Sequence, residues 1–120
     1  MTVAGFGFRK GASIAALNDA LTRAGGPKGV TALATSEDKL PGLQPLGQTL
    51  GLPVIGLPLA TLAAQTTLTH SPRVHARTGT GSLAEAAALA AAGPGARLLA
   101  PRAQSSDGTA TAALAESPLP

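Results

Sequence analysis

The sequence contains no cysteine, tryptophan or tyrosine, and its only aromatic residues are Phe6 and Phe8. The absence of cysteine excludes disulfides, thiolate metal ligands and a cysteine nucleophile. With so few aromatic residues, Ala, Leu, Val and Ile must fill the interior, and these small side chains predict closely spaced elements. The chemistry of any site must therefore come from oxygen, nitrogen or backbone groups.

Charged residues are also scarce, at 12%, whereas hydrophobic residues make up 44% of the 120 residues. This balance predicts one folded domain rather than a disordered chain. The sequence has no run of about 18 apolar residues, and its first residues lack the basic and then apolar pattern of a signal peptide. We therefore expect a cytoplasmic protein that does not enter a membrane.

The formal net charge is +3, and the basic residues are scattered along the chain. Scattered charge without aromatic stacking platforms argues against nucleic acid as a partner. A multiply anionic small molecule suits this charge better. His70 and His75 have no nearby carboxylate, so we expect neither a metal site nor a bound cofactor.

Strands and helices are predicted to alternate along the chain. Apolar runs predict strands at residues 2–7, 29–35, 53–57, 97–100 and 109–115, with a brief edge strand at 73–76. Helical spacing and start signals predict helices at 13–24, 45–50, 58–64 and 82–92, with a loop at 101–108. The pattern indicates an α/β fold: a single three-layer α/β/α domain over residues 1–115, with a central mixed, mostly parallel sheet of about five strands. Residues 116–120 are predicted to be a flexible tail.

The first candidate binding segment is residues 5–11, where a predicted strand leads into a helix. Gly5 and Gly7 would let the backbone approach an anion, and Arg9 and Lys10 would add positive charge. The spacing does not fit a dinucleotide fingerprint, because the third glycine, Gly11, falls one place late. A tight turn whose glycines only permit positive φ is the alternative explanation.

The second candidate is the loop that precedes the helix at 82–92. Gly79, Thr80, Gly81 and Ser82 offer backbone amides and hydroxyls at a helix amino end, an arrangement that holds carboxylates and phosphates. If the two loops lie on neighbouring strands, they share one crevice. Ser82 and Glu85 also fit a capping box, which explains Glu85 without any ligand.

Lys39 follows the second predicted strand and would lie at the same sheet edge. A solvated charge beside Glu37 and Asp38 is the alternative reading. No serine lies in the strained G-x-S-x-G turn of a hydrolase nucleophile, and the six acids suggest no catalytic pair. Composition alone therefore does not select an enzyme, and Glu85 is the one acid that we nominate as a catalytic base.

Four segments together resemble the cobalamin-biosynthesis family of CobE and the CbiG carboxyl-terminal domain. They are residues 5–13, 33–39, 50–53 and, most specifically, 79–88. The resemblance covers residues 2 to 115 or so. Position 8 is cysteine in many members of this family, so Phe8 excludes a thiol role there.

This resemblance implies a three-layer domain that works on the tetrapyrrole intermediates of vitamin B12 synthesis. Full-length CbiG-like proteins look like cobalt-precorrin-5A hydrolases, which open a δ-lactone and release acetaldehyde, but this chain resembles only their last domain. Standalone CobE-like members have no firmly assigned reaction. We therefore expect a carrier or accessory factor that binds a precorrin or corrin intermediate and meets other cobalamin-pathway enzymes. A hydrolase and a nucleotide-binding or structural partner domain are the alternatives.

Overall fold

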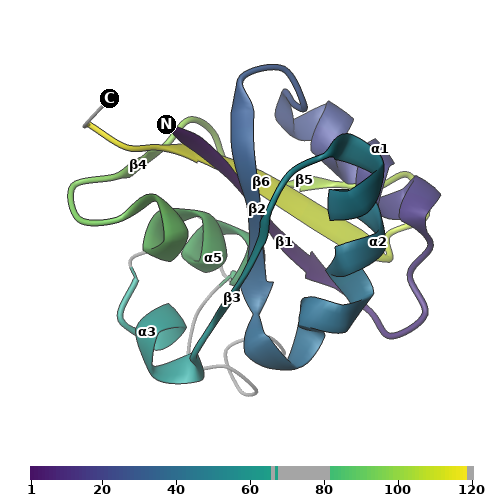
Figure 1. The fold of residues 1–120 in the computed structure, drawn as a ribbon, viewed down its shortest axis with the longest axis horizontal. Coiled ribbons are helices and arrows are strands. Elements are labelled where there is room, and N and C mark those ends of the chain that lie inside the picture. Colours follow the sequence, from purple (N-terminus) through teal and green to yellow (C-terminus); the bar gives the residue numbers. More distant parts are fainter. Residues whose placement is uncertain (66, 68–81, 119–120) are drawn as a thin grey trace.

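The computed structural model describes residues 1–65, 67 and 82–118, and six strands in these ranges form one sheet (Figure 1). The order is β3-β2-β1-β6-β4, and β5 also pairs with β6. The strands are β1 (Thr2–Phe8), β2 (Val30–Ser36), β3 (Val54–Leu57), β4 (Arg97–Leu98), β5 (Ala103–Gln104) and β6 (Ala110–Glu116).

The sheet is mixed, and most of its strands share one direction. β2 is parallel to both β1 and β3, whereas β6 is antiparallel to β1, β4 and β5. The strands β1, β2 and β3 therefore end at the same edge, where β6 begins. We call this edge, marked by Phe8, Ser36, Leu57 and Ala110, the carboxyl edge.

In the described part of the chain, helices cover both faces of the sheet (Figure 1). On one face α1 (Ile14–Ala24) and α2 (Leu40–Leu50) enclose a core with Phe6 and Leu33 of the strands. On the other face α3 (Leu59–Ala63) and α5 (Leu83–Ala92) enclose a core of smaller side chains around Val3, Ala32 and Ala34. The three-layer α/β/α prediction is confirmed.

The small residues of β1 allow α5 to lie directly on the sheet. A Cβ added at Gly5 would stand 2.1 Å from the Ala84 carbonyl oxygen and 2.4 Å from the Ala88 amide nitrogen. At Gly7 the added Cβ would be 3.4 Å from Leu83 Cβ. Both glycines therefore lie where α5 approaches β1 closely, and neither has a positive φ. Of the glycines at 5, 7 and 11, positive φ explains only Gly11, at +85°.

Most predicted boundaries lie within a residue of the observed ones, but the strand predicted at 97–100 ends at Leu98, and two differences are larger. The helix predicted from Pro45 begins at Leu40, after the 3-10 turn η1 (Glu37–Lys39), and Pro45 lies inside it. The predicted loop at 101–108 contains the two-residue strand β5. The predicted edge strand at 73–76 lies outside the described residues.

The two ends of the described chain lie close together. β6 continues to Glu116, and the Ser117 amide donates a hydrogen bond to the Met1 carbonyl oxygen at 2.8 Å. Within residues 1–65, 67 and 82–118, no helix combines the length and apolar character that a membrane crossing requires.

Candidate functional site

Lys39 lies at the carboxyl edge, as its position after β2 predicted. Its ammonium group donates a hydrogen bond to the Phe8 carbonyl oxygen at 2.8 Å and lies 5.3 Å from the centroid of the Phe8 ring. The ring in turn packs against Gly42 at the start of α2, where an added Cβ would be 2.7 Å from Phe8 Cε2. The lysine therefore holds a positive charge at the end of the central strand β1.

The amino end of α5 lies at the same edge, beside Gly7. Ser82 is the N-cap of α5, and its hydroxyl oxygen accepts a hydrogen bond from the Glu85 amide at 3.4 Å. The Ala84 amide nitrogen is 3.6 Å from the position that a Gly7 Cβ would occupy. The helix therefore directs its positive end toward the end of β1.

Glu85 is fully buried in this first turn, and its carboxylate faces the segment that precedes β5. Its Oε2 accepts a hydrogen bond from the Arg102 backbone amide at 2.9 Å. This contact was not predicted from the sequence. The hydrogen bond connects the first turn of α5 to the segment at Arg102, just before β5.

Arg9 and Lys10 are exposed in the turn that connects β1 to α1, and no described acid forms an ion pair with either. The turn is fixed by two backbone hydrogen bonds, from the Arg9 amide to Thr109 O and from the Ala12 amide to Arg9 O. It leads to α1, whereas Ser82 leads to α5 on the opposite face. Of the two predicted binding segments, the turn with Arg9 and Lys10 and the N-cap Ser82 are described, and the helices that follow them lie on different faces of the sheet.

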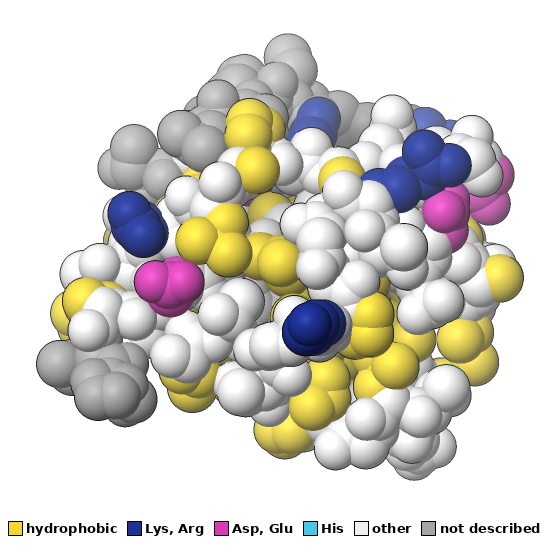
Figure 2. Space-filling view, turned by 90° about the horizontal axis from the view of Figure 1, so that it is seen from above, with side chains coloured by type: hydrophobic (Ala, Val, Ile, Leu, Met, Phe, Trp, Pro, Cys, Tyr) yellow, Lys and Arg dark blue, Asp and Glu magenta, His cyan; other side chains and the backbone are white. Residues whose placement is uncertain are grey.

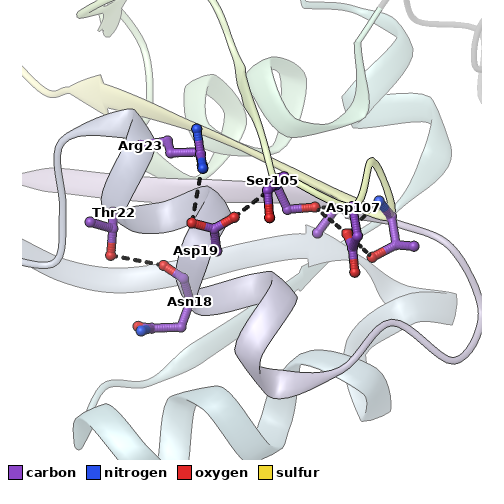
Figure 3. A network of polar contacts seen from close by, with 9 residues as sticks. Asn18, Asp19, Thr22, Arg23, Ser105 and Asp107 are labelled. Atoms are coloured by element: carbon purple, nitrogen blue, oxygen red, sulfur yellow. Dashed lines mark hydrogen bonds and ion pairs between the residues drawn. The ribbon is translucent and has the colours of Figure 1, made fainter.

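A polar network joins α1 to the turn between β5 and β6 (Figure 3). Asp19 accepts hydrogen bonds from the Arg23 side chain at 3.0 Å and from the Ser106 amide at 2.8 Å. Asp107 accepts from the Ser105 hydroxyl and from both the amide and hydroxyl of Thr109. These contacts fix the start of β6. The carbonyl oxygen of Thr109, just before β6, accepts the hydrogen bond from the Arg9 amide.

Both aspartates of this network have a lowered pKa in the folded protein. The Ser106 amide is the main cause of the lowered pKa of Asp19, and the Arg23 side chain adds to it. The Thr109 amide is the main cause of the lowered pKa of Asp107, with contributions from the Ser105 and Thr109 hydroxyls. Hydrogen bonds to a carboxylate favour its charged form, so both groups stay ionised in the native network.

Ser36 was not among the predicted binding residues. It ends β2 at the carboxyl edge and is 1% exposed. In the described part of the chain, its hydroxyl oxygen is the buried side-chain polar atom without a hydrogen-bond partner. A polar residue that ends a buried apolar strand is the sequence signal that marks this position.

The predicted site residues Gly79, Thr80 and Gly81 lie outside the described residues, as do His70 and His75. In residues 1–65, 67 and 82–118, no three side chains of types that bind metals cluster together. A hollow of about 330 Å³ lies away from the carboxyl edge, where the carboxyl end of α5 and the residues after it face α3; it is lined by Thr61, Gln65, Leu89, Ala90, Gly93, Pro94, Gly95 and Ala96.

The basic side chains do not form a single patch. On the face drawn in Figure 2, Lys and Arg side chains stand at several separate positions among hydrophobic and uncharged surface. One of the nine basic residues, Arg23, is paired with Asp19, and another, Arg97, lies 3.8 Å from Glu116. Among the described basic residues, Arg9, Lys10 and Lys39 supply the charge that we assign to the carboxyl edge.

Comparison with known proteins gives one matching family and similar solved structures. The model of the family described as "Cobalamin synthesis G C-terminus" matches residues 2–115. No curated protein matches the chain. CobE, a protein from the cobalamin (vitamin B12) biosynthetic pathway, is 37% identical over 96% of this chain and 89% of its own, with a TM-score of 0.83. The cobalamin biosynthesis protein chiG from Agrobacterium tumefaciens str. C58 is 38% identical over 98% of this chain and 99% of its own, with a TM-score of 0.70.

Proposed function

Because this chain belongs to the cobalamin synthesis G C-terminus family, we propose that it binds a precorrin or corrin intermediate of cobalamin biosynthesis at the carboxyl edge. It does so as a carrier or accessory factor that exchanges the intermediate with other enzymes of the pathway. The cytoplasmic location expected from the sequence is part of this proposal.

The observation that carries this proposal is the meeting of three positive features at one edge. The Lys39 ammonium group caps the end of β1, the amino end of α5 lies against Gly7, and Arg9 and Lys10 are exposed beside them. Ligands of open α/β sheets bind outside the carboxyl ends of the strands. The family and the charge at this edge together favour an anionic ligand of the pathway.

The chemistry of the proposed ligand suits these groups. Precorrins and corrins carry acetate and propionate carboxylates around a flat apolar ring, so Arg, Lys and backbone amides would bind the rim. A hydrogen bond to a charged group contributes roughly 1.5–3 kcal/mol. Two or three such bonds are sufficient for micromolar binding after the ordering costs are subtracted.

Titration with hydrogenobyrinic acid, followed through its visible absorption band, tests the proposal. We expect saturable binding in the micromolar range that weakens as salt screens the charges. Lys10→Gln should weaken binding severalfold. Lys28→Gln is the matched control, because Lys28 is exposed at the opposite edge, just before β2, and should bind like the unaltered protein. An unperturbed band at high micromolar ligand contradicts the proposal.

The hydrolase alternative depends on Glu85 as a catalytic base. Its carboxylate is fully buried and accepts the Arg102 amide, which favours a role in holding the start of α5. Release of acetaldehyde from a lactone-bearing intermediate would support the hydrolase alternative. For the alternative of a nucleotide-binding domain, protection of the Gly7 amide by a nucleotide but not by a corrinoid would be the supporting result.

A further inference from the structure

The Ser36 hydroxyl is a buried polar group for which the described fold supplies no partner. The side chain is 1% exposed, and its oxygen makes no hydrogen bond with any described residue. Burial of an unpaired hydroxyl is unfavourable, and such groups in a native structure call for an explanation.

Packing does not explain the hydroxyl. Residues of β2 that face α5 alternate along the strand as Ala32, Ala34 and Ser36, and both alanines belong to the core beneath α5. A third alanine would continue this row. The other buried hydroxyls of the described residues are bonded: Thr35 to Phe6 O, Ser82 to the Glu85 amide, and Ser105 to Asp107 and the Ala110 amide.

The register of β2 against β1 places Ser36 next to the residue of β1 that contacts the first turn of α5. Ala34 is the register partner of Gly5 in the neighbouring strand β1. Two residues further along each strand, Ser36 therefore lies beside Gly7, which contacts Leu83 and Ala84 of α5. Ser36 thus lies one strand away from this contact, on the β2 side.

Two amides at the amino end of α5 have no acceptor among the described residues. The Glu85 amide is bonded to the Ser82 hydroxyl and the Ala86 amide to Ser82 O. The amides of Leu83 and Ala84 come before these two and have no acceptor among the described residues. Helix amino ends of this kind attract anions through the amides and the helix dipole.

The nearest buried negative charge lies on the other side of the same turn. The Glu85 carboxylate accepts the amide of Arg102, just before β5, and β5 pairs with β6. Because β1 separates β6 from β2 in the sheet, Glu85 and Ser36 lie on opposite flanks of α5. Glu37 and Asp38 are exposed in η1, and the Lys39 ammonium group lies at Phe8 O.

We infer that the Ser36 hydroxyl and the amides of Leu83 and Ala84 form a subsite for one carboxylate of the tetrapyrrole rim. The inference rests on the proposed function and adds a specific ligand contact to it. These three groups would donate to the oxygens of that carboxylate, and because Ser36 is buried, only a slender group such as the end of an acetate arm would reach it.

Ser36→Ala tests the subsite in the hydrogenobyrinic acid titration. The substitution removes an unpaired hydroxyl and keeps the small side chain, so the free energy of unfolding should stay the same or rise. Affinity should fall about tenfold, the effect of losing one hydrogen bond to a charged group. Thr31→Val is the matched control: it removes an exposed hydroxyl from the other end of β2 and should leave affinity unchanged.

Two results separate the subsite from the proposed function. If the unaltered protein does not bind the corrinoid, the proposed function fails. If it binds and Ser36→Ala binds equally well, the subsite alone is overturned. Amide resonances provide a test without any variant: those of Leu83 and Ala84 should shift when the unaltered protein is saturated with hydrogenobyrinic acid, and unshifted resonances would also overturn the subsite.

Discussion

Gly5 lies directly under α5 and determines how closely that helix approaches the sheet. The position of its missing side chain is occupied by the helix backbone at Ala84 and Ala88. The sequence predicted that Gly5 and Gly7 let the backbone approach an anion. The structure shows that the backbone of α5 lies against Gly5. Sequence alone could not distinguish these cases, because both require a residue without a side chain.

Gly5→Ala should therefore destabilise the fold severely. The new methyl group would overlap the α5 backbone, which cannot move without losing its contacts with β1, so we expect a loss of about 3 kcal/mol or more in the free energy of unfolding. Urea unfolding measures the loss. Gly7→Ala is the graded control, since its nearest atom is Thr111 Oγ1 at 3.0 Å, and about 1–2 kcal/mol is expected. Equal stability of Gly5→Ala and the unaltered protein would refute this packing.

Ser36 shows the limit of prediction at the residue scale. Its place after β2 could be predicted from the apolar run that precedes it. Its burial and its missing partner depend on the register of β2 against β1 and on the position of α5. These are tertiary facts that no local pattern contains.

At the scale of elements, most helices and strands were predictable, including the short β3 and α3, whereas the start of the proline-containing α2 and the strand β5 were not. α1 and α5 each have a serine N-cap that bonds to the third amide of the helix, and both were predicted within a residue of their observed ends. α2 was predicted to begin at Pro45 because proline favours the first turn. The chain instead enters this helix through η1, with Pro41 in the first turn and Pro45 further in.

The polar network of Asp19 and Asp107, which joins α1 to the β5–β6 turn, should make the free energy of unfolding depend on pH. Asp19 and Asp107 have pKa values below the ordinary 3.8, mainly because backbone amides donate to them. The two carboxylates stabilise the fold fully when the pH is above their pKa in the unfolded chain. This stabilisation is lost as the pH falls through their lowered pKa in the folded protein.

The double variant Asp19→Asn with Asp107→Asn should therefore be less stable than the unaltered protein at pH 7. It should also lose less stability between pH 7 and pH 3, which urea unfolding at the two pH values would measure. Asp38→Asn, at an exposed carboxyl of η1, is the control and should keep the original pH dependence. If the double variant keeps it as well, the network does not contribute to acid stability.

For the whole molecule, the layered α/β fold and the family could be predicted from the sequence, and the meeting of Lys39 with the first candidate segment followed from the topology of parallel strands. What could not be predicted was that the two candidate segments feed helices on opposite faces. The turn with Arg9 and Lys10 and the amino end of α5 both lie at the carboxyl edge, near the end of β1. In the described part of the chain, the hollow at the other end of α5 is another place where a ligand could bind.

A ¹⁵N-resolved NMR titration with hydrogenobyrinic acid distinguishes these two places most directly. The account predicts that the shifted amides gather at the carboxyl edge, at Arg9, Lys10, Lys39 and Leu83, while those of Leu89, Gly93 and Ala96 stay in place. Shifts gathered around the hollow, with the carboxyl edge unchanged at saturation, would contradict it.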